Sequence, residues 1–267
     1  MMKASKELQT RLQKPSQNRS LERGILILRA FRPGADLLGN SDLAERTGLP
    51  PATVSRLTQT LVRTGLLEHD QRQRAYRLAT PVLSLAHAMR SGSPVLQVAA
   101  PRMRSLAETL KINVGLATVD GDEMVYLESV RYNKKISLRN VVAGQRVPIE
   151  LTSLGCAYLA VAAQLDRNEL MAHFKARRRS GWQELQQQIE QSINSVHQRG
   201  YCVASWQPEV VALATPIIVK QSPVYVLNVS VATQAAPDSV AAQLSAPLLQ
   251  LAQEIGNALS SSWHGAH

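Results

Sequence analysis

The stretch LAERTGLPPATVSRLTQTLVRTGLLEH, Leu43 to His69, decides how the first part of this chain folds. Its residues favour helix throughout, except that Pro50 and Pro51 stand side by side. Because proline lacks an N–H, a helix tolerates it just before its start or at its first position, but not inside. Gly48 suits the left-handed position at which a helix ends. The stretch therefore predicts two helices with a tight break between them, the second of which begins at Pro51.

The second of these helices carries two kinds of side chain at helical spacing. Val54, Leu57, Leu61 and Val62 are apolar and are expected to face a core. Short polar side chains occupy the first turns between them. Those are the side chains that a helix can press into a groove of a partner, and Gly65 ends the helix.

A separate helix is predicted upstream of this pair. Ser20 can cap its start, and Leu21, Ile25 and Leu28 recur on one face, which should therefore be buried. Pro33 and the glycine after it end the helix, because neither residue continues one well.

Downstream, the residues indicate a hairpin. Segments 66–68 and 75–78 predict two short strands, and the polar turn between them carries Arg72 and Arg74. Three helices and a basic hairpin are typical of a winged helix–turn–helix. In that arrangement the third helix enters the DNA major groove and the hairpin lies against the backbone or minor groove. An ordinary small helical domain is the alternative.

Charge is unevenly distributed over the 267 residues. Residues 1–90 hold 15 Lys and Arg against 7 Asp and Glu, whereas residues 91–267 hold 15 against 13. A basic first third beside a nearly neutral remainder indicates that the first third meets a polyanion. Charge alone does not separate DNA from RNA or anionic lipid, and a merely solvated basic surface would have the same composition.

Composition disfavours several classes of protein. No apolar run is long enough for a membrane helix, and the polar, basic N-terminal segment lacks the apolar core of a signal peptide. Cys156 and Cys202 match no CxxC or metal-ligand spacing, so we expect no metal and no cofactor. The chain is expected to be cytoplasmic, with no membrane partner.

At this length two domains are expected. The assigned parts are a flexible arm (1–19), the winged helix–turn–helix (20–79), a linker helix (80–93) and an effector-binding and oligomerisation domain (94–267). The last part mixes hairpin strands with helices, and predicts a mostly antiparallel sheet flanked by helices. Within it, KKISLRNV is expected to be a strand and GQRVPIEL a loop. The fold class is α+β.

Motifs of common enzymes are absent from the sequence. It contains no P-loop, no GxGxxG, no HExxH and no Gly-x-Ser-x-Gly, and none of its six histidines stands at a motif spacing from a cysteine or carboxylate. Cys156 keeps one enzyme hypothesis open, because a position near a helix start can lower a thiol pKa and make a nucleophile. We expect no enzyme; the alternative is a hydrolase that carries a DNA-binding module and uses Cys156.

Several segments occur in a familiar order: SLERGILIL, LAERTGLPPATVSRLTQTL, YRL, VDGDEMVYLE, GQRVPIELTSLGCAYLA and QRGY. From Ser20 to the C-terminus the chain thereby resembles the IclR-type bacterial transcriptional regulators. The resemblance implies a winged helix–turn–helix, a linker helix and a GAF-like domain that binds a small organic molecule, often a carboxylate. It further implies homodimers, or dimers of dimers, that bind near-palindromic operators on nucleoid DNA, as repressors or activators.

The resemblance also assigns DNA contacts. The third helix reads the operator in this family, which implies contacts for Thr53, Ser55, Arg56, Gln59 and Thr60. Arg56 suits a guanine or a phosphate and Gln59 an adenine, whereas the two earliest residues suit phosphates near the helix start. Arg72 and Arg74 would neutralise phosphates through the wing. The alternatives are a surface ion pair for Arg56 and a role as solvated charge for the wing arginines.

For the effector, the resemblance implies a cavity lined by three segments. They are a strand with its loop, a helix start whose free N–H groups suit a carboxylate, and the late strands. The implied lining residues are Ile136, Arg139, Val147, Thr152, Ser153, Leu154, Gly155, Ser205, Val210, Ala212, Ser230 and Ala232. If Arg139 points inward it pairs with an anionic ligand; otherwise it is an exposed strand arginine.

After Tyr201 the chain departs from the family. The segment CVASWQPEVVALATPI is shorter than usual and lacks a glycine, and Gly155-Cys156 stands where Gly-Lys is usual. The usual effector of the family therefore need not apply.

Overall fold

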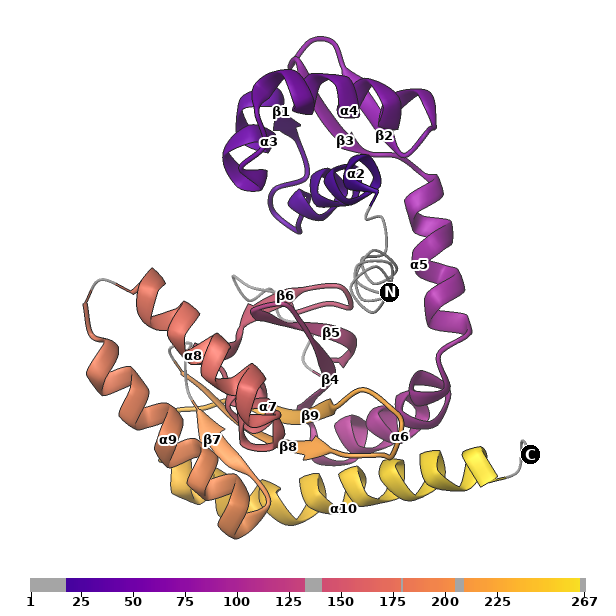
Figure 1. Cartoon of the computed structure of the whole chain (residues 1–267). Helices are drawn as coiled ribbons and strands as arrows, with labels where there is room; N and C mark the ends of the chain where they lie inside the picture. The colour runs from indigo at the N-terminus through magenta and orange to yellow at the C-terminus, as the bar shows by residue number, and fades with distance from the viewer. Residues whose placement is uncertain (1–17, 133–140, 179, 205–208, 265–267) are drawn as a thin grey trace, which may run out of the picture. The chain divides into compact units, whose positions relative to one another are not determined.

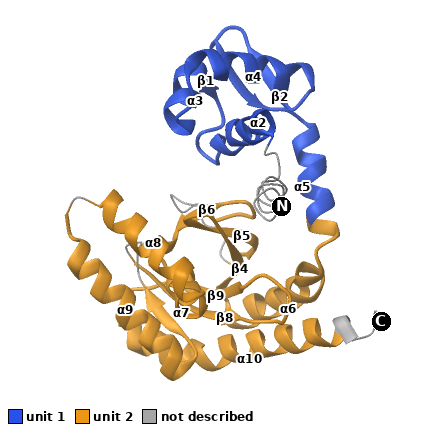
Figure 2. Ribbon diagram, viewed as in Figure 1, with its two compact units in different colours: residues 1–89 blue, residues 90–267 orange. Residues whose placement is uncertain are grey.

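The chain forms two compact units in the computed structural model, residues 1–89 and residues 90–267 (Figures 1 and 2). The structure describes residues 18–132, 141–178, 180–204 and 209–264. Helices and antiparallel strands occur in both units, which confirms the α+β class. None of the helices within those ranges combines the length and the apolarity that a membrane span requires.

Unit 1 packs helices on a small sheet. Its elements are α2 (Arg19–Ala30), β1 (Leu38–Gly39), α3 (Asn40–Thr47), α4 (Pro51–Arg63), β2 (Leu67–Asp70), β3 (Ala75–Leu78) and most of α5 (Pro81–Ser91). The sheet is antiparallel with order β1-β3-β2, and β2 and β3 form a hairpin, here called the wing. Together α2, α3, α4 and the wing are the predicted winged helix–turn–helix.

The break between α3 and α4 has the predicted geometry. Gly48 adopts φ +67° and donates its N–H to the Ala44 carbonyl at 2.9 Å, which ends α3. Pro50 precedes α4 and Pro51 is its first residue, so neither proline removes a helical hydrogen bond. The core that the helices and wing share includes Ile27, Leu38, Leu43, Val54, Leu57, Leu61, Leu67 and Tyr76.

Two details of α2 differ from the prediction. Asn18, rather than Ser20, caps the helix, because its Oδ1 accepts the Leu21 N–H at 3.2 Å. Ile27 is buried, whereas Leu21 is 61% exposed and Ile25 is exposed as well. The segment LERGILILRAF holds two adjacent apolar stripes, and helical periodicity alone cannot decide which of them faces the core.

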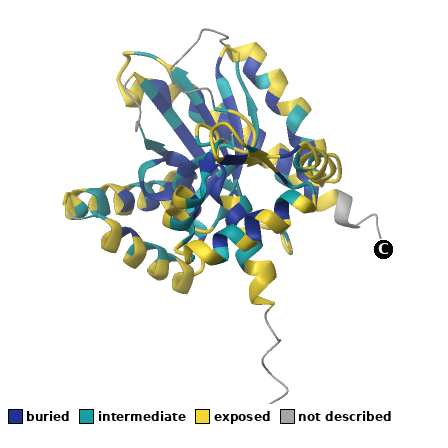
Figure 3. Cartoon of the chain, turned by 90° about the horizontal axis from the view of Figure 1, so that it is seen from above, coloured by how far each residue is buried: buried dark blue, intermediate teal, exposed yellow. Residues whose placement is uncertain are grey.

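Unit 2 is built on an antiparallel sheet of order β6-β5-β4-β9-β8-β7. Its elements are α6 (Pro94–Leu110), β4 (Asn113–Asp120), β5 (Glu123–Val130), β6 (Arg146–Pro148), the 3-10 turn η1 (Ile149–Leu151), α7 (Ser153–Val161), α8 (Gln164–Arg177), α9 (Trp182–Arg199), β7 (Cys202–Ala204), β8 (Val210–Ile217), β9 (Tyr225–Ala232) and α10 (Pro237–His264). α6 and α10 cover one face of the sheet, while α7 covers the other and α9 packs on α7. In Figure 3 the strands are mostly buried and the helices expose their outward faces.

The loop predicted at GQRVPIEL is instead an edge strand followed by a turn. Val147 of β6 lies opposite Met124 of β5. Arg146 holds this edge, because its Nε donates to Glu123 at 2.7 Å and its Nη1 to Asp120 at 2.6 Å. A strand of three residues is too short to show alternation, so the sequence pattern could not reveal it. Nearly all of the strand predicted at KKISLRNV lies outside the described residues.

Candidate functional site

The two sides of α4 differ in character. The buried side is formed by Val54, Leu57, Thr58 and Leu61. The predicted contacts follow the opposite side, where Arg56, Gln59 and Thr60 are exposed and Thr53 and Ser55 are half-buried. An apolar inner face fixes the helix on its core, and this leaves the polar face free to enter a groove.

Arg63 extends this polar surface and was missing from the prediction. It is exposed and lies seven residues, about two turns, after Arg56, so both arginines stand on the same side of α4. α4 contains no acidic residue, and no carboxylate in the described part of the chain forms an ion pair with Arg56. A basic residue in the last turn of a helix is favoured by the helix dipole alone, so the position of Arg63 in the sequence does not by itself indicate a DNA contact.

The turn of the wing holds Arg72 and Arg74 exposed. Asp70 organises this turn: its Oδ1 accepts the N–H of Arg72 at 3.0 Å and of Gln73 at 3.1 Å, and its Oδ2 pairs with the Arg77 guanidinium. The hydrogen bond from Gln73 is the largest of the effects that hold the pKa of Asp70 below its usual value, and with the other two contacts it outweighs desolvation. Arg74 adopts φ +50°, in the left-handed region.

Four of the implied effector contacts meet in the sheet of unit 2. Val210 lies opposite Ala232, and Ala212 lies opposite Ser230, in the β8–β9 pairing. Side chains alternate along a strand, and Val211 belongs to the core on the α6 and α10 side. The four residues therefore share the face that α7 covers.

The start of α7 is buried on that same face. Thr152, Ser153, Leu154 and Gly155 are all buried there. Thr152 Oγ1 accepts the Gly155 N–H at 3.2 Å, so one of the N–H groups expected to meet a carboxylate is taken up by the helix's own cap. A Cβ on Gly155 would lie 2.0 Å from the Ile149 carbonyl oxygen, so the helix packs directly on η1.

One further implied contact reaches this group from the other edge of the sheet. Val147 is buried on β6, which β5 and β4 separate from β9, and it shares a core cluster with Leu154 at the start of α7. Ile136, Arg139 and Ser205 lie outside the described residues. The described contacts thus extend from the β8–β9 pairs, through the start of α7, to Val147 on β6.

A buried polar strip beside Ser230 was not predicted. Asn228 is 6% exposed and lies two residues before Ser230, opposite Gly115. Asn113 lies opposite Ser230, and no described group hydrogen-bonds its buried Oδ1. Burial raises the pKa of Tyr126 to about 12, although a hydrogen bond with Asn228 lowers this pKa in part. The segment YVLNVSVA could have indicated this strip, because its Asn and Ser are two residues apart and polar residues at that spacing in a strand share one face.

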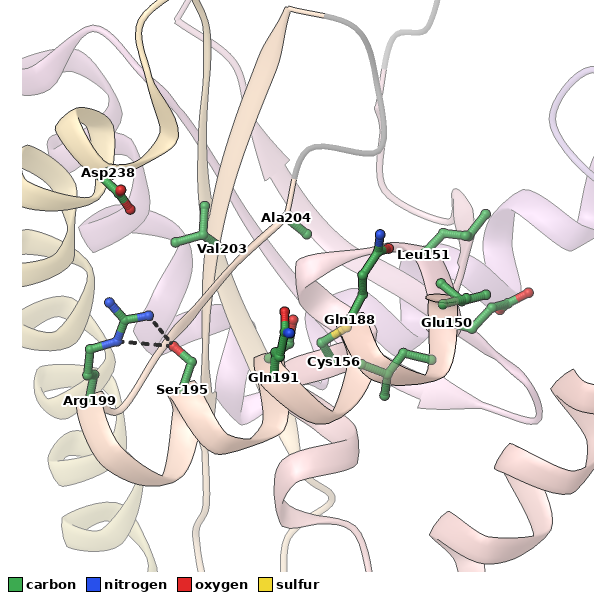
Figure 4. Close-up of a pocket in the computed structure, with 13 residues that line it drawn as sticks. Glu150, Leu151, Cys156, Gln188, Gln191, Ser195, Arg199, Val203, Ala204 and Asp238 are labelled. Atoms are coloured by element: carbon green, nitrogen blue, oxygen red, sulfur yellow. Dashed lines mark hydrogen bonds between the residues drawn. The ribbon is translucent and has the colours of Figure 1, made fainter. Parts of the chain in front are cut away.

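A cavity of about 560 Å³ lies one strand further along, between α9, η1, α7 and β7 (Figure 4). Its lining residues are Glu150, Leu151, Cys156, Leu185, Gln188, Ile189, Gln191, Ser192, Ser195, Arg199, Val203, Ala204 and Asp238. None of the described residues implied as effector contacts is among them, although Ala204 pairs with Ala212. In Figure 4 Gln188, Gln191 and Ser195 project from α9 toward β7.

Arg199 carries the only positive charge among the described lining residues. It donates to Ser195 Oγ from Nη2 at 2.7 Å and from Nε at 3.2 Å, and it stacks over the Tyr201 ring at 5.2 Å from the centroid. One lining carboxylate, Glu150, is engaged elsewhere, because its Oε1 accepts from Arg177 at 2.7 Å. The cavity therefore offers amides, hydroxyls, one held cation and the carboxylate of Asp238.

Cys156 does not have the environment of a nucleophile. It is 4% exposed, and burial raises the pKa of its thiol to about 11, although a hydrogen bond with Ser192 opposes the rise. Burial likewise raises the pKa of Cys202 well above its ordinary value. Because the thiolate is the reactive form, a thiol with this pKa is inert at neutral pH.

Comparison with known proteins gives one family for both units. Residues 20–71 match the IclR helix-turn-helix domain, and residues 87–257 match the domain described as bacterial transcriptional regulator IclR C-terminal. The HTH-type transcriptional regulator TsaQ1/TsaQ2 of Comamonas testosteroni is 35% identical over 186 residues. These residues make up 69% of this chain and 66%, just under two thirds, of that relative.

Solved structures show the same fold. An IclR family transcriptional regulator from Brucella abortus is 32% identical and superposes with a TM-score of 0.82 over 91% of this chain and 94% of its own. An IclR homolog from Microbacterium hydrocarbonoxydans, complexed with 4-hydroxybenzoate, shares the fold at 23% identity and a TM-score of 0.67 over 91% of this chain and 99% of its own. The family is one of regulators rather than enzymes, so the hydrolase alternative is wrong. The chain belongs to the IclR family of DNA-binding bacterial transcriptional regulators.

Proposed function

We propose that unit 1 binds a near-palindromic operator on bacterial nucleoid DNA, in the cytoplasm, and that a small organic acid bound by unit 2 changes the affinity. The observation that carries the DNA-binding part is the exposed polar side of α4, whose opposite side is buried in the core. In this proposal Arg56 grips a guanine or a phosphate and Gln59 pairs with an adenine. Thr53 and Ser55 contact phosphates near the start of the helix, and Thr60 is a further DNA contact.

The test is the affinity for DNA that flanks the protein's own gene. Fluorescence anisotropy at low salt compares wild type with Arg56→Ala and with Arg104→Ala, a matched control that removes an exposed arginine from α6 in unit 2. Loss of a bidentate base contact is worth about 1–3 kcal/mol, which is about 5- to 150-fold in affinity for the specific fragment. Arg104→Ala should bind like wild type. Equal binding by Arg56→Ala would remove this residue from the interface.

We further propose that two copies of the chain occupy one operator. Unit 1 exposes large apolar side chains on α2 and α5, namely Leu21, Ile25, Leu26, Leu83, Leu85 and Met89. Leu83 is 71% exposed, and α5 buries none of its residues. A surface of this kind is typical of a contact with another protein. A second copy related by a twofold axis would cover it and set two α4 helices on the two half-sites.

Sedimentation velocity at micromolar concentration tests this association. The double variant Leu83→Glu/Leu85→Glu should shift the protein from a dimer, or a dimer of dimers, toward smaller species, because burying two carboxylates in an apolar contact is costly. The control Ser105→Glu/Thr109→Glu adds the same charge to exposed positions of α6 and should leave the mass unchanged. A wild type that binds its operator as a monomer would contradict the proposal.

The effector part has two supports. A member of the same fold binds 4-hydroxybenzoate, a carboxylate. Unit 2 contains a cavity of about 560 Å³, a volume typical of small-molecule pockets, with Arg199 in its lining. Two arginines are therefore candidates for the carboxylate: Arg139, which the family resemblance implies, and Arg199, which lines the cavity. The proposed walls of the site with Arg139 remain the start of α7 and the side chains of Val147, Val210, Ala212, Ser230 and Ala232. None of these residues lines the cavity that holds Arg199.

A thermal-unfolding panel of 4-hydroxybenzoate, benzoate and aliphatic dicarboxylates separates the two arginines. A ligand at about 100 times its Kd stabilises the folded state by about 2.7 kcal/mol. We expect at least one acid to raise the unfolding temperature of wild type, and either Arg199→Gln or Arg139→Gln to abolish that rise. If no acid in the panel shifts wild type, a carboxylate effector is wrong for this chain.

A further inference from the structure

The wing carries an acidic residue where DNA binding disfavours one. Asp70 ends β2, and the exposed Arg72 and Arg74 follow it in the turn. A carboxylate held near phosphates is repelled by them, so the charge of Asp70 on its own weakens binding. Its presence has to be explained by something other than charge.

Three contacts give Asp70 a structural task. Its Oδ1 accepts two successive backbone N–H groups, from Arg72 and Gln73, and its Oδ2 pairs with Arg77 across the hairpin. The turn segment QRQR contains no glycine, yet Arg74 takes φ +50°, which residues with a Cβ rarely adopt. The turn sequence does not favour this shape by itself, and the Asp70 side chain supplies the missing hydrogen-bond acceptors.

We infer that Asp70 is a positioning residue for DNA binding: it fixes the wing turn so that Arg72 and Arg74 meet the phosphate backbone together. This inference rests on the proposed contact between the wing and DNA. Asp70 touches no DNA in this arrangement. It removes the cost of ordering the turn when the complex forms, as preorganised loops do.

Two variants of equal charge separate position from electrostatics. Asp70→Asn keeps an oxygen that can accept both N–H groups, and Asp70→Ala has none, while each removes one negative charge. A third variant, Asp70→Glu, keeps the charge and displaces the carboxylate by one methylene. Anisotropy with a random-sequence duplex over a range of KCl concentrations gives affinity and its salt slope, and circular dichroism confirms that each variant is folded.

Asp70→Asn should bind at least as tightly as wild type, with the same salt slope. Asp70→Ala should bind about 5- to 10-fold more weakly than Asp70→Asn, with a slope smaller by about 1–2, because each phosphate contact contributes about 0.9 to the slope. Asp70→Glu should also lose slope. A general loss of stability would change the melting temperature without changing the slope.

The double variant Arg72→Ala/Arg74→Ala distinguishes failure of the Asp70 inference from failure of the proposed contact between the wing and DNA. If it loses about 2 in slope while Asp70→Ala and Asp70→Asn bind alike, the positioning role is wrong and the wing contact stands. If the double variant keeps the wild-type slope, the wing does not reach the phosphates, and both the contact and the inference are wrong.

Discussion

Unit 1 carries its candidate site on the outside and unit 2 carries most of its candidate site on the inside. The predicted contacts of α4 are exposed or half-buried. The start of α7 is buried, while Val210, Ala212 and Ser230 in the sheet are half-buried and only Ala232 is exposed. An exposed site forms as soon as one helix packs its apolar face on the core. A buried site forms only if the strand register, the position of the covering helix and the paths of the connecting segments are all correct. A substitution is therefore expected to change binding in unit 1 and folding in unit 2.

The largest effect expected from this contrast is at Gly155. Gly155→Ala places a Cβ 2.0 Å from the Ile149 carbonyl oxygen, and neither backbone can move without parting α7 from η1. We expect the free energy of unfolding of unit 2 to fall by several kcal/mol, on the order of 3 or more. Urea unfolding followed by circular dichroism measures it.

A second helical glycine of unit 2 is the control for that experiment. In Gly256→Ala the new Cβ meets only Ile217 Cγ2, at 3.8 Å, which is an ordinary contact. That variant should be neutral or more stable by up to about 1 kcal/mol, because alanine is the better helix former. If Gly155→Ala unfolds at the same urea concentration as Gly256→Ala, the close packing of α7 on η1 is wrong.

An effect of intermediate size is expected for the thiol reactivity of Cys156, which is buried in unit 2. The pKa of about 11 for Cys156, against an ordinary value of 9.0, lowers the thiolate fraction at pH 8 by about 100-fold. We expect native protein to react with a thiol reagent at least about 100-fold more slowly than urea-unfolded protein at that pH. The native rate should rise with pH until about pH 11. Fast labelling of Cys156 at pH 8 would show that this part of unit 2 is open to solvent.

The smallest effect concerns Arg63, the outward residue that prediction missed. Arg63→Ala should weaken DNA binding a few-fold and reduce the salt slope by about 1, because one phosphate contact is lost. The same salt titration on Arg104→Ala provides the comparison at constant charge. A salt slope identical to that of wild type would mean that the DNA contacts of α4 end before its last turn.

The same contrast explains what could be predicted from sequence. The break at Pro50 and Pro51 and the wing hairpin depend on residues within a few positions of one another, and local stereochemistry decides them. The winged helix–turn–helix follows from those local features, whereas the DNA contacts proposed for α4 come from the family resemblance. The choice of buried stripe on α2 depends on what packs against it, which no local pattern contains.

In unit 2 the missed features are those set by distant pairings. Asn113 and Asn228 become neighbours because β4 pairs with β9, two strands that are more than a hundred residues apart in the chain. Gln188 and Gln191 are exposed on α9, and they line a cavity only because β7 and α9 lie against each other. The family resemblance implies positions for an effector site. The local sequence does not indicate which of these residues the fold brings together.

Within the described residues, the sheet of unit 2 ends on each side in a strand of three residues, β6 and β7. An open strand edge is a template onto which another polypeptide can add, and proteins guard such edges with short strands, prolines and charges. β6 uses all three: Pro148 has no N–H to offer, and Arg146 is tethered to two carboxylates. The described part of β6 therefore disfavours the addition of a strand from a second copy of the protein at this edge.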